Sequence, residues 1–427
     1  MRKPQQVQSV ERAYLVAVAL KRPARVPGYS RNHSEWMDEL AELTRSAGGV
    51  VVGKSIQSKE AFDPAYLIGR GKLQEIRAEA GALEADLIIF GQNLSPTQQR
   101  NLEKEVACRV IDRTQLILDI FARHARSREG QLQIELAQLN YLLPRLTGRG
   151  VELSRLGAGI GTRGPGEQKL EKDRRRIRER IRRIKAEIEA VRRQRATRRA
   201  ARQAVPLGTV ALVGYTNAGK STLFNKLTRA EVYISDQMFA TLDPTLRLLE
   251  LPSRRRFLLS DTVGFIRDLP PGLVAAFRAT LEELQEAALL VHVSDLADPH
   301  HPEHEAEVQK VLGELGLAGK PCLSVYNKID LLGPEERGDY ETGNGKVYVS
   351  ALKEIGLERL LQCLDEALVE ESPVRITLRL PASDGRTLAL LHRYGRVVRK
   401  EYHSSGVVVE AEVSPRLAEN LRVYSLK

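Results

Sequence analysis

The sequence predicts a multidomain α/β protein, and three observations support this prediction. The chain has 427 residues, more than one ordinary hydrophobic core contains. Residues 10–121 alternate short apolar runs with helical stretches, a pattern typical of parallel α/β domains. A strongly basic, helix-favouring segment then separates this region from a second α/β region. Hydrophobic residues make up 42% and charged residues 28% of the chain, which favours globular domains over disorder.

The first α/β region follows a flexible tail at residues 1–9. Its predicted strands are Ala13–Leu20, Gly49–Gln57, Asp86–Phe90 and Arg109–Asp112, and its predicted helices are Ser34–Ser46, Gly71–Ala82 and Ser95–Glu105. Ser95 is a good helix cap and Pro96 suits the first turn. The turn Leu67–Lys72 resembles a shortened phosphate-binding loop, but its spacing is incomplete, so a tight turn before a helix is favoured.

Residues 122–205 predict an antiparallel helical hairpin. The segment 169–203 carries 16 Lys and Arg against 5 Asp and Glu, which equals the whole chain's net charge of +11. Its apolar residues recur at helical spacing and form one seam: Leu170, Ile177, Ile181, Ile184, Ile188 and Val191. The predicted partner helix carries Leu132, Leu136, Leu139 and Leu143, and Pro144 is expected to end it.

The tip of this hairpin, Arg145–Gly166, has seven Gly and four Arg. A loop of this length in a compact domain is usually functional, and glycine allows close approach to another surface. The basic helix and its tip can therefore contact a phosphate backbone. A solvated hairpin with a flexible tip is the alternative.

Residues 206–372 predict a doubly wound, nucleotide-binding domain. After the strand Thr209–Val213, the segment Gly214–Ser221 fits G-x-x-x-x-G-K-[ST]. Backbone N–H groups in such a loop surround the phosphates of a nucleotide, here those of Gly214, Tyr215, Thr216, Asn217, Ala218 and Gly219. Lys220 reaches the β- and γ-phosphates, and the Ser221 hydroxyl is a Mg²⁺ ligand.

A second motif follows the strand Arg256–Asp261. The motif is Asp261, Thr262, Val263 and Gly264. Asp261 can hold Mg²⁺ through a water molecule, and the N–H of Gly264 can contact the γ-phosphate. The next residue, Phe265, stands where Ras carries the Gln that orients the attacking water. Intrinsic hydrolysis is therefore expected to be slow. The loop Phe265–Pro271 and the residues after it, Gly272–Glu286, are expected to form the second, mobile switch.

Two further motifs indicate guanine. The strand Cys322–Tyr326 leads into Asn327, Lys328, Ile329 and Asp330. The Asp330 carboxylate can accept hydrogen bonds from the N1–H and the amino group of guanine, and Lys328 can lie over the base. The backbone of Ser350, Ala351 and Leu352 can meet the guanine carbonyl. Four motifs in this order identify a GTPase that takes GTP as substrate and GDP as product, with Mg²⁺ as cofactor.

The first switch is expected at Phe239, Ala240, Thr241, Leu242 and Asp243, followed by Pro244 and Thr245. Spacing alone leaves Thr241 and Thr245 open as the Mg²⁺ ligand. The cluster His300, His301 and His304 is expected to be a polar loop and helix start rather than a zinc site. Residues 373–427 predict a small α+β domain, whose Arg393, Arg396, Arg399 and Lys400 either contact RNA or are merely exposed.

These motifs resemble the HflX family of translational GTPases over nearly the whole chain. The resemblance rests on the Gly-rich stretch Gly157–Glu167, the basic helix, Gly214–Thr222, Phe239–Thr245, Asp261–Pro270 and the motifs at Asn327 and Ser350. It implies that Thr241, rather than Thr245, is the switch ligand, so the expected catalytic residues are Lys220, Thr241 and Gly264. It also implies binding to the large ribosomal subunit and its RNA, with splitting or rescue of stalled ribosomes under stress.

The composition indicates the cellular compartment in which the protein is expected. Three widely separated Cys, no adequate membrane span and no secretory signal favour a cytoplasmic protein without stable membrane insertion, and we expect a monomer. A non-ribosomal RNA-binding GTPase adaptor is the main alternative. A membrane-linked regulator is a second one, disfavoured because the basic helix has no Trp or Phe for a lipid interface.

Overall fold

The structure is a computed structural model. It describes residues 10–21, 33–146, 165–203, 207–228, 238–239, 245–267, 284–333, 343, 345–368, 374–381, 383–403, 406–413 and 415–425. The described residues form two compact units. The N-terminal unit contains residues 10–189 together with 238–239 and 267, and the GTPase unit contains the remainder, including the C-terminal residues.

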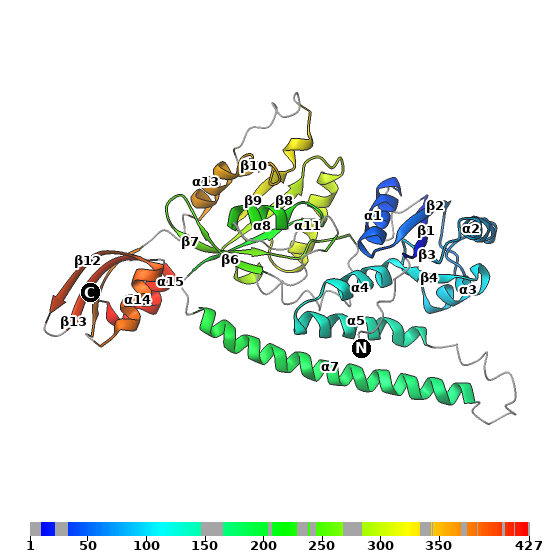
Figure 1. The fold of residues 1–427 in the computed structure, drawn as a ribbon, viewed down its shortest axis with the longest axis horizontal. Coiled ribbons are helices and arrows are strands. Elements are labelled where there is room, and N and C mark those ends of the chain that lie inside the picture. Colours follow the sequence, from blue (N-terminus) through cyan, green and yellow to red (C-terminus); the bar gives the residue numbers. More distant parts are fainter. Residues whose placement is uncertain are drawn as a thin grey trace, which may run out of the picture. The chain divides into compact units, whose positions relative to one another are not determined.

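The N-terminal unit contains a four-stranded, fully parallel sheet (Figure 1). Its strands are β1 (Arg12–Leu20), β2 (Val50–Lys59), β3 (Leu87–Phe90) and β4 (Arg109–Asp112), in the order β2-β1-β3-β4. The connecting helices are α1 (His33–Ser46), α2 (Arg70–Ala82) and α3 (Pro96–Val106). The predicted parallel α/β fold is confirmed. Crossover helices are required because parallel neighbours cannot be joined by a tight turn.

Buried aliphatic and aromatic side chains hold this sheet against its helices. The core includes Tyr14, Ile76, Ile88, Phe90 and Leu102. Helix α3 begins at the predicted cap: the Ser95 hydroxyl accepts the Gln98 N–H at 3.1 Å, and the Gln98 side chain accepts the Ser95 N–H at 2.9 Å. Such a reciprocal pair satisfies two N–H groups that the first helical turn cannot pair internally.

Two helices, rather than one, precede the basic helix. Helix α4 (Arg113–His124) and helix α5 (Arg128–Arg145) are separated by a short break, and the Ser127 hydroxyl caps α5 by accepting the Gly130 N–H at 3.0 Å. The expected stop at Pro144 is wrong by one residue, because α5 continues to Arg145. Proline lacks the N–H that would bond to the carbonyl four residues earlier, and only one further residue follows it in the helix.

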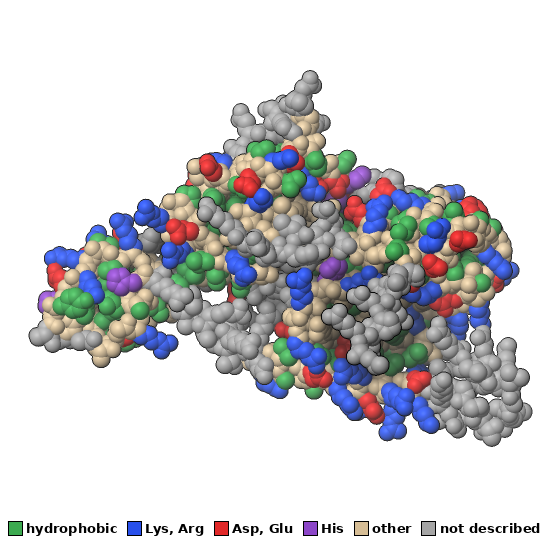
Figure 2. All heavy atoms as spheres, in the orientation of Figure 1, with side chains coloured by type: hydrophobic (Ala, Val, Ile, Leu, Met, Phe, Trp, Pro, Cys, Tyr) green, Lys and Arg blue, Asp and Glu red, His purple; other side chains and the backbone are tan. Residues whose placement is uncertain are grey.

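The basic segment is a single helix, α7 (Pro165–Gln203), that packs antiparallel to α5. Arg128 pairs with Glu187 at 2.6 Å, and Glu135 pairs with Arg180 at 2.7 Å, so the two sequences run in opposite directions. Of the predicted seam, Ile181, Ile184 and Ile188 are buried. The predicted hairpin is confirmed, while its tip lies outside the described residues. Figure 2 shows Lys and Arg side chains gathered over α7.

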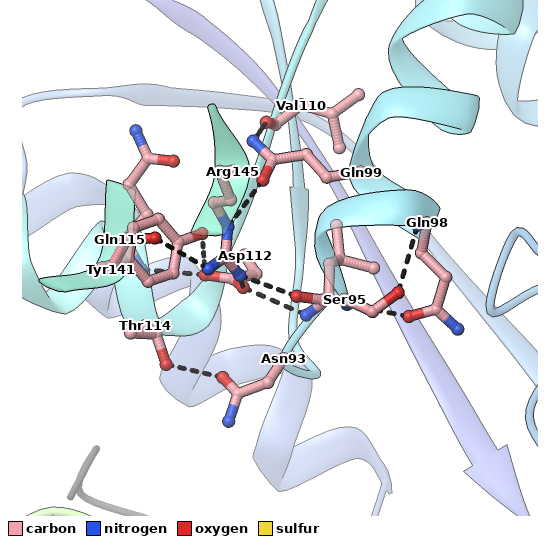
Figure 3. A network of polar contacts seen from close by, with 11 residues as sticks. Asn93, Ser95, Gln98, Gln99, Val110, Asp112, Thr114, Gln115, Tyr141 and Arg145 are labelled. Carbon is pink, nitrogen blue, oxygen red and sulfur yellow. Dashed lines mark hydrogen bonds and ion pairs between the residues drawn. The ribbon is translucent and has the colours of Figure 1, made fainter. Parts of the chain in front are cut away.

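A buried carboxylate fixes the end of β4 (Figure 3). Asp112 is fully buried, and its two oxygens accept hydrogen bonds from the N–H groups of Leu94 (3.0 Å) and Gln115 (2.9 Å), the Tyr141 hydroxyl (2.8 Å) and the Arg145 guanidinium (3.1 Å). Leu94 lies in the loop between β3 and α3, Gln115 lies in α4, and Tyr141 and Arg145 lie in α5. Asp112 thereby joins the sheet to both helices that lead to α7.

The GTPase unit contains a six-stranded sheet in the order β10-β9-β8-β5-β7-β6. The strands are β5 (Thr209–Val213), β6 (Thr245–Glu250), β7 (Arg256–Asp261), β8 (Leu289–Asp295), β9 (Cys322–Asn327) and β10 (Lys346–Tyr348). All neighbours are parallel except β6, which pairs antiparallel with β7. Helices α8 (Lys220–Thr228), α11 (His301–Glu314) and α13 (Leu357–Ala367) complete the predicted doubly wound domain.

The C-terminal residues form the predicted small α+β element. Three antiparallel strands, β11 (Val374–Leu380), β12 (Arg396–His403) and β13 (Gly406–Val413), lie in the order β11-β13-β12. Helices α14 (Gly385–Tyr394) and α15 (Pro415–Asn420) share a core with the sheet. Among the described residues of the whole chain, no helix is both long enough and apolar enough to cross a membrane.

Candidate nucleotide-binding site

The predicted motifs meet at one edge of the GTPase-unit sheet. Strands β5, β7, β8 and β9 are parallel neighbours, so their carboxyl ends lie at the same edge. Gly214 follows β5, Asp261 ends β7 and Asn327 ends β9. This edge is where doubly wound sheets bind their ligands. The structure therefore brings together three sequence motifs that lie more than 40 residues apart in the chain.

The loop Gly214–Gly219 connects β5 to α8, which begins at Lys220. Gly219 has a φ of +88°, and a Cβ there would lie 2.2 Å from Asn327 Nδ2. Only glycine fits this position, because both the backbone angle and the close approach exclude a side chain. The N–H groups at the start of α8 are unpaired within the helix and can face an anion.

Lys220 is buried, with 6% of its surface exposed. Its Nζ donates to the carbonyl oxygens of Gly214 (3.1 Å) and Tyr215 (2.6 Å). Burial lowers the pKa of Lys220 to about 8, although the nearby Asp261 carboxylate opposes this shift. A phosphate group would favour the charged amine and reverse the effect of burial.

Ser221 and Asp261 lie side by side, with the Ser221 hydroxyl donating to Asp261 Oδ2 at 2.7 Å. Asp261 is fully buried at the end of β7. A hydroxyl and a carboxylate are the oxygen ligands that Mg²⁺ prefers, so these residues fit a magnesium site. The adjacent Thr262 hydroxyl is occupied elsewhere, since it donates to the Leu212 carbonyl.

The start of the second switch pairs with the phosphate loop. The Phe265 N–H donates to the Gly214 carbonyl at 3.0 Å, and the Thr216 N–H donates to the Phe265 carbonyl at 2.8 Å. Val263 is buried, and Gly264 fits closely: a Cβ on it would lie 2.9 Å from Thr216 Cα and 3.1 Å from Lys220 Nζ. The backbone of Gly264 thus lies directly beside the Lys220 amine.

The Asn-Lys-Ile-Asp motif is tied to two other loops. Asn327 Nδ2 donates to the Ala218 carbonyl at 2.9 Å, and its Oδ1 accepts the Ala351 N–H at 2.9 Å. Lys328 has a left-handed φ of +65°, and its Nζ pairs with Asp295 Oδ2 at 2.7 Å. Ile329 and Asp330 lie in the short helix η1 (Ile329–Leu331). Asn327 therefore positions the motif against the phosphate loop.

The last predicted motif is a tight turn after β10. Ser350 and Ala351 are buried, whereas Leu352 is 66% exposed. The Ser350 hydroxyl accepts the Lys353 N–H at 3.0 Å, which stabilises the turn. The structure thus brings the Ser350 turn to the same edge as Asn327. Ala240, Thr241, Leu242 and Asp243 lie outside the described residues, while Thr245 begins β6 opposite Asp261.

Two helices of the N-terminal unit contact the described residues at the two switches, 238–239 and 267. Met238 directly precedes the first switch, and its N–H donates to the Ser46 hydroxyl at the end of α1 (2.8 Å). Phe239 begins the switch, and its ring packs edge-on against Phe121 of α4 (4.5 Å between centroids). Beyond the second switch motif, Arg113 of α4 donates to the Arg267 carbonyl at 2.7 Å.

Arg113 is itself fixed by a buried ion pair with Glu39 of α1. Because Arg113 and Phe121 both belong to α4, and Ser46 and Glu39 both belong to α1, a single helix pair contacts both segments. These segments belong to the N-terminal unit, whereas the nucleotide motifs on either side belong to the GTPase unit. Sequence analysis did not predict this connection.

Sequence analysis also missed two contacts of the site itself. His304 stacks on Tyr215 of the phosphate loop, with 4.0 Å between ring centroids and 9° between ring planes. Asp295, at the end of the unpredicted strand β8, is the partner of Lys328. His304 does lie in the predicted helix start, since α11 begins at His301. Neither contact has a local sequence signal, because each joins segments distant in the chain.

Three sequence families match consecutive parts of the chain. Residues 34–122 match the family described as GTP-binding GTPase N-terminal, residues 124–202 the GTP-binding GTPase middle region, and residues 209–328 a 50S ribosome-binding GTPase. The chain is 47% identical over 414 residues to GTPase HflX of Caldanaerobacter subterraneus subsp. tengcongensis, covering 97% of this chain and 94% of the relative. It is 46% identical over 377 residues to GTPase HflX of Escherichia coli K12, covering 88% of each.

A solved structure is also similar. The GTP-binding protein of the archaeon Sulfolobus solfataricus in complex with GDP is 26% identical, with a TM-score of 0.44, over 84% of this chain and 99% of that one. The sheet edge, its motifs and the family matches define a P-loop GTPase, an enzyme that binds and hydrolyses GTP. The chain belongs to the HflX family of GTPases.

Proposed function

We propose that this GTPase acts on the large ribosomal subunit, and that it splits or rescues stalled ribosomes in the cytoplasm as a monomer. The observation that carries the proposal is the contact of residues 238–239 and 267, at the two switches, with α1 and α4 of the N-terminal unit. A partner that docks on this unit can thereby influence the segments that close on GTP. The match to a 50S ribosome-binding GTPase supports the ribosome as that partner.

The charge of the basic helix α7 is consistent with a surface that binds RNA. Between residues 171 and 193 it carries eleven Lys and Arg against five acidic residues. Several of its arginines are exposed, Arg182 and Arg183 among them, on the helix surface away from the buried Ile181 and Ile184. Exposed arginines can pair with phosphate groups, and each such pair releases counterions on binding. Ribosomal RNA supplies a dense phosphate surface of the required charge.

The roles of the site residues are part of this proposal. Lys220, Thr241 and Gly264 stabilise the γ-phosphate during hydrolysis, and the loop Gly214–Gly219 holds the phosphates. Ser221 and Thr241 would be the direct Mg²⁺ ligands, with Asp261 acting through water; the ion neutralises phosphate charge. Asp330 selects guanine, assisted by Lys328, Ser350 and Ala351.

The testing experiment measures steady-state GTP hydrolysis with and without isolated large ribosomal subunits. We expect clear stimulation of the slow intrinsic rate, because phosphoryl transfer depends on positioning. In a double variant, Arg182→Glu with Arg183→Glu, stimulation should weaken and binding should depend less on salt, by roughly one unit of log–log slope for each phosphate that is no longer neutralised. A matched control reverses two exposed arginines of the GTPase unit, Arg247 and Arg256.

The outcomes separate the alternatives. Equal loss in both double variants would show a general charge effect and remove α7 from the interface. Absence of stimulation, together with tight binding to other RNA, would favour the non-ribosomal adaptor. Binding to anionic vesicles without RNA binding would favour the membrane-linked regulator.

A further inference from the structure

The phosphate loop contains a threonine whose side chain the motif does not require. Thr216 is one of the unspecified positions of G-x-x-x-x-G-K-[ST], and it is 6% exposed. Its backbone N–H is occupied, since it donates to the Phe265 carbonyl at 2.8 Å. Its hydroxyl is the group of interest.

Among the described residues, the Thr216 hydroxyl has no hydrogen-bond partner. Other buried or half-buried threonines behave differently: the hydroxyls of Thr44, Thr228 and Thr262 each donate to a backbone carbonyl, those of Leu40, Phe224 and Leu212. A buried hydroxyl without a partner is unfavourable, and in a native protein it calls for an explanation such as a ligand.

The position of Thr216 indicates which ligand. A Cβ built on Gly264 would lie 2.9 Å from Thr216 Cγ2 and 3.1 Å from Lys220 Nζ. The Thr216 methyl group therefore lies beside Gly264, whose backbone in turn lies beside the Lys220 amine, and both of these residues are proposed to contact the γ-phosphate. The neighbouring Phe265 cannot orient a water molecule, because its side chain has no hydrogen-bonding group.

We propose that Thr216 is a catalytic residue of GTP hydrolysis, whose hydroxyl contacts the γ-phosphate and the attacking water. The hydroxyl donates to a γ-phosphate oxygen and accepts a hydrogen bond from the water. The water oxygen bonds to the γ-phosphorus while the bond from that phosphorus to the bridging oxygen breaks. The bridging electron pair leaves with GDP, and the water proton ends on the released phosphate. Thr216 orients the water but takes no proton.

The proposal relies on the GTP hydrolase activity of the family and not on ribosome binding. The decisive pair of variants is Thr216→Val, which keeps the shape but removes the hydroxyl, and Thr216→Ser, which keeps the hydroxyl. Single-turnover GTP hydrolysis should fall roughly 10- to 100-fold in Thr216→Val, the loss expected for one hydrogen bond to a charged group. Thr216→Ser should stay within about threefold of the wild type.

Two further readouts separate catalysis from structure. GDP affinity should be unchanged in both variants, because GDP lacks the γ-phosphate. The melting temperature of Thr216→Val should be equal or higher, because an unpaired buried hydroxyl has been removed. Ser260→Ala is the matched control: the Ser260 hydroxyl on β7 also has no partner among the described residues, but it is outside the proposed machinery, so turnover should not change.

Wild-type turnover in Thr216→Val would overturn the proposal. Equal slowing in Thr216→Val and Thr216→Ser would also overturn it, because the loss would then follow from packing. A parallel loss of GDP affinity would indicate a disturbed phosphate loop instead of a missing catalytic group. If Thr216→Val does not fold, Thr216→Ala replaces it, and a fast alanine variant contradicts the proposal in the same way.

Discussion

Two buried polar groups of this protein contrast sharply in their surroundings. Asp112, in the N-terminal unit, accepts four hydrogen bonds from three surrounding segments (Figure 3). Thr216, in the phosphate loop, has a hydroxyl without a partner among the described residues. The first group is satisfied by the protein itself, so its role is to join helices to a sheet. The second is left without a protein partner beside Gly264 and Lys220, which is consistent with a group that binds a ligand.

The largest stability effect is expected at Asp112. Replacement by Ala leaves the Leu94 and Gln115 N–H groups without their acceptor, and each buried polar group left unsatisfied costs about 1–3 kcal/mol. The Arg145 guanidinium loses one partner but keeps the Gln99 side chain and the Tyr141 and Leu94 carbonyls. The free energy of unfolding from denaturant titration measures this. Asp86→Ala is the control, because its exposed carboxylate accepts only the Arg12 N–H among the hydrogen bonds described. A similar loss in both variants would contradict the scaffold role.

At Lys220 we expect the reverse of Asp112: a loss of GTP turnover without a loss of stability. Lys220→Met should lower the GTP turnover number by about 100-fold or more, the typical loss for one preorganised donor beside a reacting group. Stability should not fall, because burial already disfavours the charged amine. Lys226→Met, at the exposed end of the same helix, should leave turnover unchanged. Loss of stability without loss of turnover would place Lys220 among the scaffold residues.

The specificity for guanine gives a third test, which concerns a residue of the nucleotide-binding site. Asp330→Asn removes an acceptor for guanine, so GTP affinity should fall by roughly 10- to 100-fold, while the melting temperature stays constant. Xanthosine triphosphate presents a carbonyl where guanine has its amino group, and it should bind the variant better than GTP does. Calorimetric titration with both nucleotides measures the switch. Equal GTP affinity in variant and wild type would remove Asp330 from the base pocket.

The smallest expected effect is the uptake of protons when GTP binds next to Lys220. The pKa of Lys220 is about 8 without a bound phosphate, below its unfolded value, so between pH 8 and about 10 the unfolded state binds more protons and stability rises with pH. GTP should restore the charge. Binding near pH 8 should therefore take up about half a proton, measured by calorimetry in buffers of different ionisation enthalpy. Lys220→Met should show no such uptake, and wild-type uptake of zero would contradict the assigned cause.

The sequence alone was sufficient to predict those parts of the site that consist of consecutive residues. The loop Gly214–Ser221 was predicted because its glycines, lysine and serine are adjacent and lie between a strand and a helix. Strand β8 was missed, since Leu289–Ser294 is buried on both faces and the alternation of apolar and polar side chains that would mark a half-buried strand does not extend over its whole length. The break before α5 was also missed, because the surrounding residues favour a continuous helix and only the Ser127 cap marks it.

Contacts between distant segments had no sequence signal at all. The pairing of Phe239 with Phe121, and of Arg113 with the Arg267 carbonyl, depends on how the chain returns to α4. The unpartnered state of the Thr216 hydroxyl likewise became visible only in three dimensions. The predicted domain boundaries and the role of Thr241 stay predictions.

The attachment of residues 238–239 and 267 to the N-terminal unit has a thermodynamic consequence. Suppose that replacing GDP with GTP changes how strongly this unit binds a partner by a given factor. Linkage requires that the same partner change the relative affinity for GTP and GDP by an equal factor. A tenfold preference corresponds to about 1.4 kcal/mol. Among the described residues, the contacts at Ser46, Phe121 and Arg113 connect the N-terminal helices to the ends of the switches, so they can contribute to that coupling free energy.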